Sequence, residues 1–240
     1  MVILLLFWFY LIGFAILMGG EVNSEIGKEI SRLRALEEGG YDASLSQVLL
    51  GGPEVGEALV ADAGVALLSA TGSTRMGRQV GPVVAERFGR SLLELGGNNA
   101  AVVAPSADLE LAARGITFAA AGTAGQRCTT MRRLIVHEDV ADALVARLAD
   151  IFAGLRIGDP LADGTLVGPL INATAYESMG RALDQALADG GELVVGGGRR
   201  AAAEHGDAYY VEPAIVRMPA QTAVVQEETF APILYVLRYR

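Results

Sequence analysis

Hydrophobic residues along this chain recur with two spacings, one typical of helices and one typical of strands. Helical spacing is clearest in residues 73–89, where Gly89 is expected to end the helix and Pro82 to kink it. The apolar residues that define the buried face of this expected helix are Met76, Val80, Val83, Val84 and Phe88.

Other segments continue the alternation. Further helices are expected at 54–64, 109–122, 139–155 and 174–191. Asp108 or Ser106 is expected to cap the helix at 109–122, and Asp139 the helix at 139–155. A short apolar run predicts a buried strand at 65–70, and further strands are predicted at 91–95, 100–104, 132–137, 192–197, 209–216 and 233–239. Strands that alternate with helices indicate an α/β fold with a largely parallel sheet.

The first residues have a different character, because Val2–Met18 carries no charge. As a helix this segment would span roughly 25 Å, slightly less than the ~30 Å hydrocarbon core of a membrane. No Lys or Arg precedes it and no small-residue cleavage pattern follows, so it is not a typical signal peptide. Two interpretations stay open: a membrane anchor with the remaining chain on the cytoplasmic side, or a foreign start joined to a soluble, cytoplasmic body.

Composition and charge exclude several classes of function. The chain has 240 residues, 52 % hydrophobic, which is enough for a sizeable core. Its 28 acidic and 19 basic residues give a net charge of −9, which disfavours nucleic acid as a partner. One cysteine excludes an intrachain disulfide and a cysteine-rich metal site. The two histidines, His137 and His205, form no metal-binding spacing, so no metal is expected.

The single cysteine lies in the stretch "GTAGQRCTT", residues 122–130. Cys128 could be a small buried residue that only fills space. Alternatively it is a nucleophile on a tight turn, where Arg127 and free backbone N–H groups would stabilise its thiolate. His137, nine residues later, offers a weaker pairing of the kind found in thiol hydrolases.

Two other stretches carry candidate chemistry. In "TGSTRMG", residues 71–77, a glycine after a strand and hydroxyl residues at the start of a helix form either an anion site or an ordinary cap. In "LLELGGNN", Glu94 ends an apolar strand. Burial there would make it a stronger base, whereas a carboxylate facing water would have no such role.

Taken together, these stretches resemble the aldehyde dehydrogenase superfamily. The segments that carry the resemblance are "LLSATGSTRMG", "LLELGGNNA", "GQRCTT", "GPLIN", "YYVEPAIV" and "QEETFAPIL". They follow the family's order and cover about Ala35 to Arg240. The stretches "FGRSLLELGGNNA" and "AAAGTAGQRCTTMRRL" are most similar to the antiquitin-type branch, the aminoadipate-semialdehyde dehydrogenases, and Asn98 stands where most other branches have a lysine.

The resemblance implies NAD-dependent oxidation of a small-molecule aldehyde, such as aminoadipate semialdehyde, to a carboxylic acid. Cys128 matches the thiol that forms a thiohemiacetal and then a thioester, and its backbone N–H matches an oxyanion donor. Glu94 matches the base that activates water for hydrolysis of the thioester. Arg127 matches the arginine expected to bind the substrate carboxylate through paired hydrogen bonds.

The resemblance also assigns residues to the NAD cofactor. Ser73 matches a contact to the pyrophosphate, and Gly72 allows close approach of the backbone. Leu95 matches the residue whose backbone meets the nicotinamide amide. Glu228 matches the acid that holds the nicotinamide ribose, and Phe230 the ring beside it.

The pattern and the resemblance divide the chain into a hydrophobic segment (1–20), a linker (21–33), a partial, Rossmann-like NAD-binding domain (34–95) and an α/β catalytic domain (96–240). The family's first segment, with its ribose-binding lysine and oxyanion amide, has no counterpart before "ALEEGG". Its last segment, with the substrate-closing loop and the oligomer strand, has none after "ILYVLRYR". If functional, the chain is expected to form a homo-oligomer. The alternative is an inactive, truncated relic that binds nucleotide weakly or associates with partners, with membrane contact through residues 2–18.

Overall fold

The computed structural model describes residues 38–42, 47, 49–200 and 208–240. The chain divides into two compact units, Met1–Gly96 and Gly97–Arg240. The boundary in the sequence falls within the glycine pair that follows Leu95. Within the described ranges, no helix is long and apolar enough to cross a membrane. The apolar segment at residues 2–18, for which an anchor was one interpretation, lies outside these ranges.

The first unit contains two parallel strands and two helices. Helix α3 (Pro53–Ala61) is followed by β1 (Leu67–Thr71), α4 (Thr74–Glu86) and β2 (Arg90–Glu94). Each residue of β1 pairs in register with one of β2, ending with Thr71 opposite Glu94. Neither strand contains a fully buried residue, so the prediction that 65–70 is a buried strand is wrong in its burial.

The end of α4 differs from the predicted one. The helix runs through Pro82 but ends at Glu86 instead of Gly89. Phe88 adopts φ 57°, and the Gly89 N–H donates to Val84 O while the Phe88 N–H donates to Ala85 O. This is the Schellman pattern, in which one left-handed residue reverses the chain. Phe88 is therefore 97 % exposed and takes no part in the apolar face.

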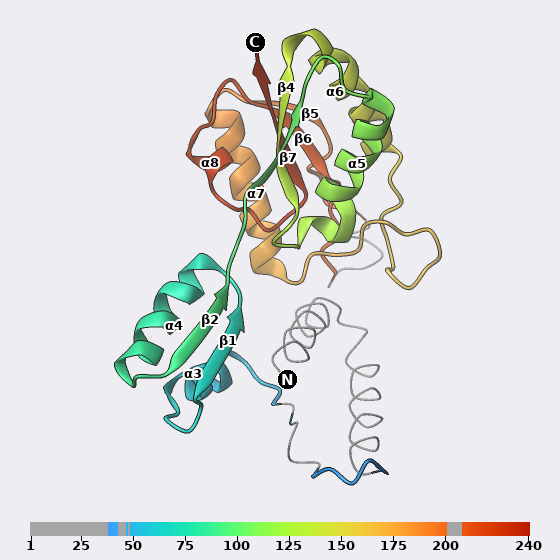
Figure 1. The fold of residues 1–240 in the computed structure, drawn as a ribbon. Helices are drawn as coiled ribbons and strands as arrows, with labels where there is room; N and C mark the ends of the chain where they lie inside the picture. Colours follow the sequence, from blue (N-terminus) through green and yellow to red (C-terminus); the bar gives the residue numbers. More distant parts are fainter. Residues whose placement is uncertain (1–37, 43–46, 48, 201–207) are drawn as a thin grey trace. The chain divides into compact units, whose positions relative to one another are not determined.

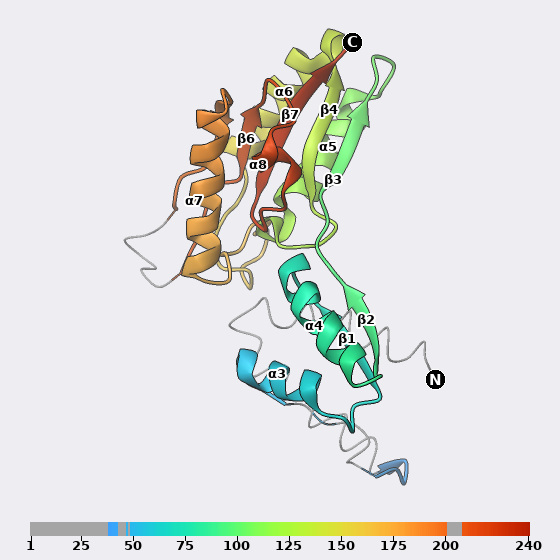
Figure 2. The ribbon, with the colours of Figure 1, turned by 90° about the vertical axis from the view of Figure 1, so that its left-hand side faces the viewer.

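The second unit is a five-stranded sheet with helices on both faces. Its elements are β3 (Asn99–Val103), α5 (Leu109–Ala121), the 3₁₀ turn η2 (Gly122–Gly125), β4 (Met131–His137), α6 (Glu138–Ala153), α7 (Ala173–Ala188), β5 (Glu192–Val195), β6 (Ala214–Arg217), α8 (Ala223–Gln226) and β7 (Ile233–Tyr239). The strand order is β3-β4-β7-β6-β5, and only the β5–β6 pairing is antiparallel. Helices α5 and α6 cover one face and α7 lies on the other (Figure 1, Figure 2). The predicted α/β architecture with a mainly parallel sheet is confirmed.

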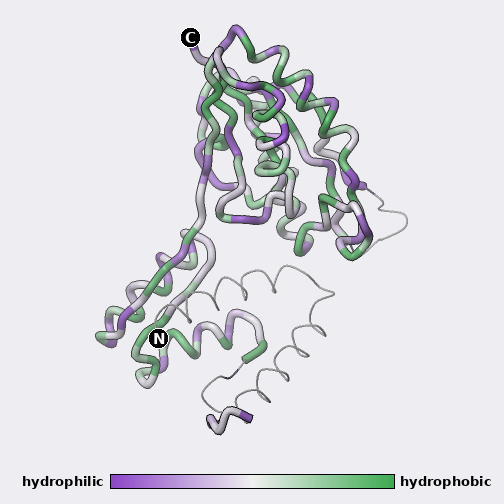
Figure 3. Tube along the Cα trace, turned by 45° about the vertical axis from the view of Figure 1, so that its right-hand side comes forward, coloured by the Kyte–Doolittle hydropathy of each residue, from purple (hydrophilic) through white to green (hydrophobic). Residues whose placement is uncertain are grey.

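The hydrophobic core lies where the central strands meet these helices. Ile233–Leu237 in β7 and Ala214–Val216 in β6 are buried throughout, whereas β4 alternates between buried and half-buried positions. Along α4 and α6 the hydropathy changes repeatedly between apolar and polar, as in helices with one buried face (Figure 3). This packing fixes the starts of β4 and β7, which follow the loops bearing Cys128 and Glu228.

Local capping agrees with the sequence at one helix and differs at another. Asp108 caps α5, with Oδ1 accepting from the Glu110 and Leu111 N–H groups. The prediction that Asp139 caps α6 is wrong, because the helix starts at Glu138 and His137 Nδ1 accepts from the Asp139 N–H. The strand predicted at 209–216 is also shorter, since only Ala214–Arg217 joins the sheet ladder.

Candidate active site

In the first unit, four of the predicted site residues gather at the carboxyl ends of β1 and β2. Gly72 follows β1, and its N–H donates to Glu94 O over 2.9 Å, so the two strand ends lie side by side. Ligands of open parallel sheets bind outside this edge. Gly72, Ser73, Glu94 and Leu95 therefore belong to one edge of one unit.

Ser73 caps α4 and leaves part of its first turn open. Its Oγ accepts from the Met76 N–H over 3.1 Å. Within the described residues, the Thr74 and Arg75 N–H groups have no acceptor. A Cβ at Gly77 would lie 2.7 Å from a Leu95 methyl group, so this glycine allows α4 to pack closely on Leu95. The helix start thus has the free donors and positive dipole end that suit a phosphate.

Glu94 is the last residue of β2, and its side chain is exposed. The structure thus lacks the burial on which the stronger-base interpretation depended, and it agrees with a strand-end carboxylate that faces water. A water-accessible carboxylate can still take a proton from water, so the exposure does not conflict with the role that the resemblance implies.

In the second unit, the loop that bears Cys128 begins with a tight left-handed run. Thr123, Ala124 and Gly125 have φ 54°, 52° and 68°. A Cβ at Gly125 would lie 2.3 Å from the Ala231 carbonyl carbon, so only glycine fits between this loop and the start of β7. Two of these left-handed residues are not glycine, which stores strain of the kind that concentrates at functional sites. The run brings the chain back to β4 with the Cys128 side chain exposed.

The carbonyl of Cys128 accepts a hydrogen bond from Asn99 and packs closely against Gly97. Asn99 Nδ2 donates to Cys128 O over 2.7 Å and to Thr130 O over 3.1 Å. A Cβ at Gly97 would lie 2.6 Å from the same Cys128 oxygen. The carbonyl is therefore fixed, while the Cys128 N–H has no acceptor in the described part of the chain. A free N–H beside the thiol is suited to donate to an oxyanion.

Glu228 lies in the segment between α8 and β7 and is held by one oxygen only. Its Oε1 accepts from the Gly97 N–H over 3.2 Å and from Arg132 Nη2 over 3.1 Å. No hydrogen bond to its Oε2 occurs among the described residues, so this oxygen can accept from a ligand hydroxyl. The Phe230 ring is 40 % exposed, with its centroid 5.5 Å from the Arg132 guanidinium.

Arg132, in β4, donates hydrogen bonds both to Glu228 and to the loop that bears Cys128. It is only 2 % exposed. Burial lowers the pKa of Arg132, and the carboxylate of Glu228 opposes this shift. The guanidinium still remains charged, because an arginine pKa lies far above neutrality.

Arg127 points toward helix α5. Its Nη2 donates to Phe118 O over 3.1 Å, and its guanidinium lies 5.0 Å from the centre of the Phe118 ring. Phe118 O is one of the last carbonyls of α5, where the helix dipole favours a cation. The Arg127 Nε is buried and has no partner among the described residues. The guanidinium is therefore held at the end of α5, and no hydrogen bond of its Nη1 occurs among the described residues.

Comparison with known proteins identifies the family of this chain. The model of the aldehyde dehydrogenase family matches residues 29–240, which is most of the chain. The chain belongs to the aldehyde dehydrogenase family. It is 43 % identical over 205 residues to aldehyde dehydrogenase family 7 member B4 of Arabidopsis thaliana, covering 85 % of this chain and 40 % of that one.

Further relatives point to the same branch of the aldehyde dehydrogenase family. The alpha-aminoadipic semialdehyde dehydrogenase of Bos taurus is 42 % identical over 225 residues, with 92 % of this chain and 41 % of the relative covered. This chain thus spans about two fifths of the length of the curated relatives it matches.

Solved structures confirm the aldehyde dehydrogenase fold. A putative aldehyde dehydrogenase from Burkholderia cenocepacia superposes with a TM-score of 0.74 at 35 % identity, covering 77 % of this chain and 38 % of that one. A betaine aldehyde dehydrogenase from Staphylococcus aureus, crystallised with NAD⁺, gives a TM-score of 0.76 at 28 % identity, with 80 % and 38 % covered.

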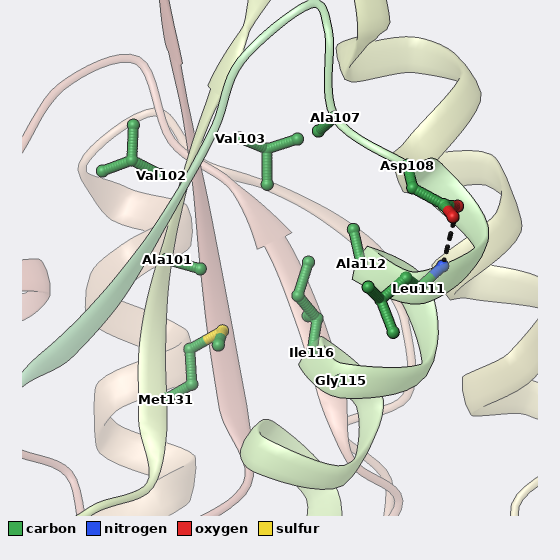
Figure 4. A pocket seen from close by; sticks show the side chains of 10 residues that line it. All are labelled: Ala101, Val102, Val103, Ala107, Asp108, Leu111, Ala112, Gly115, Ile116 and Met131. Carbon is green, nitrogen blue, oxygen red and sulfur yellow. Dashed lines mark hydrogen bonds between the residues drawn. The ribbon is translucent and has the colours of Figure 1, made fainter.

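An apolar groove of about 350 Å³ between β3 and α5 is lined by none of the candidate site residues. Ala101, Val103, Leu111, Ile116 and Met131 point toward it, and its only acid, Asp108, is bound to the Leu111 N–H (Figure 4). The groove contains no nucleophile and no free titratable group. It therefore offers packing surface but no chemistry for the candidate site.

Gly97, Asn99 and Arg132 contact the candidate site residues but were not predicted from the sequence. The sequence did carry a signal for Arg132, because in β4 it lies on the same face as Leu134 and Val136, which are buried in the core. A cation on the apolar face of a strand is a candidate for a buried, paired group. The bond of Asn99 to Cys128 O spans 29 positions and that of Gly97 to Glu228 spans 131, so no local pattern predicts them.

Proposed function

We propose that this chain carries the catalytic chemistry of an NAD-dependent aldehyde dehydrogenase, with Cys128 as the nucleophile. The observation that supports it is the exposed thiol on a loop held by Asn99 and Arg132, next to a free backbone N–H. The same network leaves one oxygen of Glu228 open to a ligand. A thiol beside an oxyanion donor and a diol-binding carboxylate suits covalent capture of a carbonyl compound near a ribose.

The residues present fit an NAD cofactor. Gly72 and Ser73 would face the pyrophosphate at the open start of α4, and the backbone of Leu95 the nicotinamide amide. Glu228 Oε2 would accept from the nicotinamide ribose, and Phe230 would pack beside the ring. Bound NAD supplies the nicotinamide ring that accepts a hydride from the substrate carbon.

The chain's own residues carry the remaining steps. The Cys128 thiolate adds to the aldehyde carbon, and the oxygen that takes the electron pair accepts from the Cys128 N–H. After the carbon has lost its hydride, a thioester links the acyl group to Cys128. Glu94 takes a proton from the water that attacks this thioester, and the carboxylic acid leaves as the thiolate is restored.

We further propose that the aldehyde carries a carboxylate, as aminoadipate semialdehyde does. Arg127 precedes the thiol by one residue, and no hydrogen bond of its Nη1 occurs among the described residues. A guanidinium binds a carboxylate through two parallel hydrogen bonds, which would orient the aldehyde end toward Cys128. The names of the Bos taurus and other relatives favour the same substrate class.

The test is NADH formation by the purified chain with aminoadipate semialdehyde and with an uncharged aldehyde. Cys128→Ala should abolish turnover, and Glu94→Gln should slow it roughly 10²- to 10⁴-fold, because a general base contributes about that much. Arg127→Met should slow only the reaction of the charged aldehyde. Glu177→Gln, an exposed carboxylate on α7, is the matched control for Glu94→Gln.

Two other results would favour the alternatives. Ester hydrolysis without NAD⁺, lost in Cys128→Ala, together with no NADH formation, would indicate a thiol hydrolase. A folded chain that binds NAD⁺ without any turnover would indicate a nucleotide-binding relic.

A further inference from the structure

Arg132 is among the largest fully buried side chains of the described residues, and its charge is almost completely removed from water. A buried charge is strongly destabilising unless it is paired and hydrogen-bonded. Five hydrogen bonds meet this requirement here, and all three guanidinium nitrogens take part. The question is why β4 keeps a cation at a position where Leu134 and Val136 continue its apolar face.

The acceptors of Arg132 lie in three separate segments of the chain. From the turn after Leu95, Gly97 O accepts from Nε over 3.3 Å. From the thiol loop, Gly125 O accepts from Nη1 over 3.3 Å and Arg127 O from Nη2 over 3.2 Å. Near Phe230, Thr229 O accepts from Nη1 over 2.7 Å and Glu228 Oε1 from Nη2 over 3.1 Å.

Nη2 has a special place in this arrangement, because it bonds to both Arg127 O and Glu228 Oε1. Arg127 O belongs to the peptide group that contains the Cys128 N–H. A guanidinium is planar and its donors have fixed directions. A shift of the Glu228 carboxylate therefore changes the position of the peptide that precedes the thiol.

We propose that Arg132 is a positioning residue that couples the ligand-binding carboxylate of Glu228 to the loop bearing Cys128. The inference rests on the proposed function, since it assigns to Glu228 a cofactor hydroxyl at Oε2. Binding at Oε2 adjusts Glu228, and the rigid guanidinium passes this adjustment to the Arg127–Cys128 peptide. Lysine keeps the charge but has no planar fork, so it cannot hold all of these acceptors in one geometry.

The single cysteine makes the coupling directly measurable, because any alkylated thiol in the chain is Cys128. We would follow iodoacetamide alkylation by mass spectrometry, without NAD⁺ and at saturating NAD⁺, in the full chain. NAD⁺ binding would be measured separately by calorimetry. The variants are Arg132→Lys, Glu228→Gln and, as control, Arg217→Lys, which changes a strand arginine with only surface ion pairs.

In the wild type we expect NAD⁺ to change the alkylation rate. In Arg132→Lys we expect the cofactor-free rate to differ from wild type by about tenfold, since small displacements of reacting groups have effects of that order or larger. The ratio of the rates with and without NAD⁺ should fall to about one in Arg132→Lys and in Glu228→Gln. Arg217→Lys should behave like the wild type in both readouts.

A purely structural role for Arg132 would lower the free energy of unfolding but leave the alkylation of the folded chain unchanged. Wild-type cofactor-free alkylation in folded Arg132→Lys would therefore overturn the inference. If that variant does not fold by circular dichroism, Glu228→Gln decides by its rate ratio. If the wild type binds no NAD⁺, the proposed function fails, whereas the cofactor-free rate of Arg132→Lys still decides the positioning role.

Discussion

At the scale of single residues, the loop around Cys128 is held by side chains that come from elsewhere in the second unit. Asn99 binds two of its carbonyls, and Arg132 binds two more. Gln126, the buried residue two positions before the thiol, binds Pro169 O and the Ile171 N–H. The loop is therefore fixed by specific hydrogen bonds, each of which one substitution can remove.

Asn99→Asp replaces the amide donor by a carboxylate oxygen that faces two carbonyl oxygens. We expect it to lower the free energy of unfolding by about 1–2 kcal/mol, because two hydrogen bonds are lost. The matched control is Asn172→Asp, where Oδ1 caps α7 by accepting from the Ala175 N–H and aspartate caps equally well. Urea unfolding of both variants is the measurement, and equal stabilities would contradict the role of Asn99.

Tyr235 gives a prediction for alkaline pH. Burial raises the pKa of Tyr235 to about 12 from its ordinary value of 10.0. Because the folded-state pKa is the higher one, the contribution of Tyr235 to stability is complete below pH 10 and is lost between pH 10 and about 12. The full loss amounts to roughly 2–3 kcal/mol, as follows from a shift of this size.

The measurement is urea unfolding of the wild type and of Tyr235→Phe across this pH range. The variant has no phenol to ionise, so its stability should fall less steeply than that of the wild type. Tyr41→Phe, which changes an exposed tyrosine, is the control. Parallel curves for the wild type and Tyr235→Phe would show that the buried phenol does not govern alkaline unfolding.

At the scale of elements, the sequence was most informative where one spacing continued without interruption. The run 233–239 coincides with β7, because seven consecutive strand-forming residues lie in the centre of the sheet. The ends of elements were less predictable. Phe88 takes the left-handed position expected for glycine, and His137 caps α6 in place of an aspartate. Both depend on local contacts that composition does not specify.

The candidate site was predictable in its residues and not in its connections. Motif resemblance supplied Cys128, Glu94, Ser73 and Glu228, whose types and order are visible in the sequence. The bonds of Arg132 and Gly97 to Glu228 span more than ninety positions, and only the folded sheet brings these residues together. Sequence patterns with a period of two or of 3.6 residues contain no information about such pairs.

Substitutions of Ser73 at the start of α4 distinguish an ordinary helix cap from a phosphate-binding site. Ser73→Asp keeps a capping oxygen, so the free energy of unfolding should stay close to that of the wild type. Its carboxylate would, however, repel a pyrophosphate, and NAD⁺ affinity should fall roughly tenfold or more. Ser73→Ala should instead lower stability by about 1 kcal/mol. Calorimetric titration with NAD⁺ and urea unfolding give both readouts, and unchanged affinity in Ser73→Asp would leave Ser73 as a cap alone.

At the scale of the whole molecule, burial among the described residues is distributed unevenly between the two units. The residues of the main hydrophobic cluster all lie between Val103 and Leu237, in the second unit. In the first unit, β1 and β2 have five residues each and no fully buried position. A two-stranded sheet of this kind has little stability of its own.

The rates of native-state hydrogen exchange should therefore differ between the strands of the two units. Amides of β4 and β7 should exchange only through global unfolding, whereas those of β1 and β2 should exchange through local opening, at least roughly 100-fold faster. Mass spectrometry of peptic fragments after deuterium labelling measures this directly. Equal protection in both sets of strands would show that the first unit unfolds together with the second.

The bond between the Gly97 N–H and Glu228 joins residues 131 positions apart, nearly the first and the last parts of the second unit. During synthesis at about 5–20 residues per second, Glu228 is made roughly 5–20 s after Cys128, which precedes it by 100 positions. Through that interval Cys128 has already been made, but the carboxylate that completes its surroundings does not yet exist. A nascent chain therefore carries its only thiol in an unfinished loop, and oxidants that meet it on the ribosome act on a cysteine that the mature fold has not yet positioned.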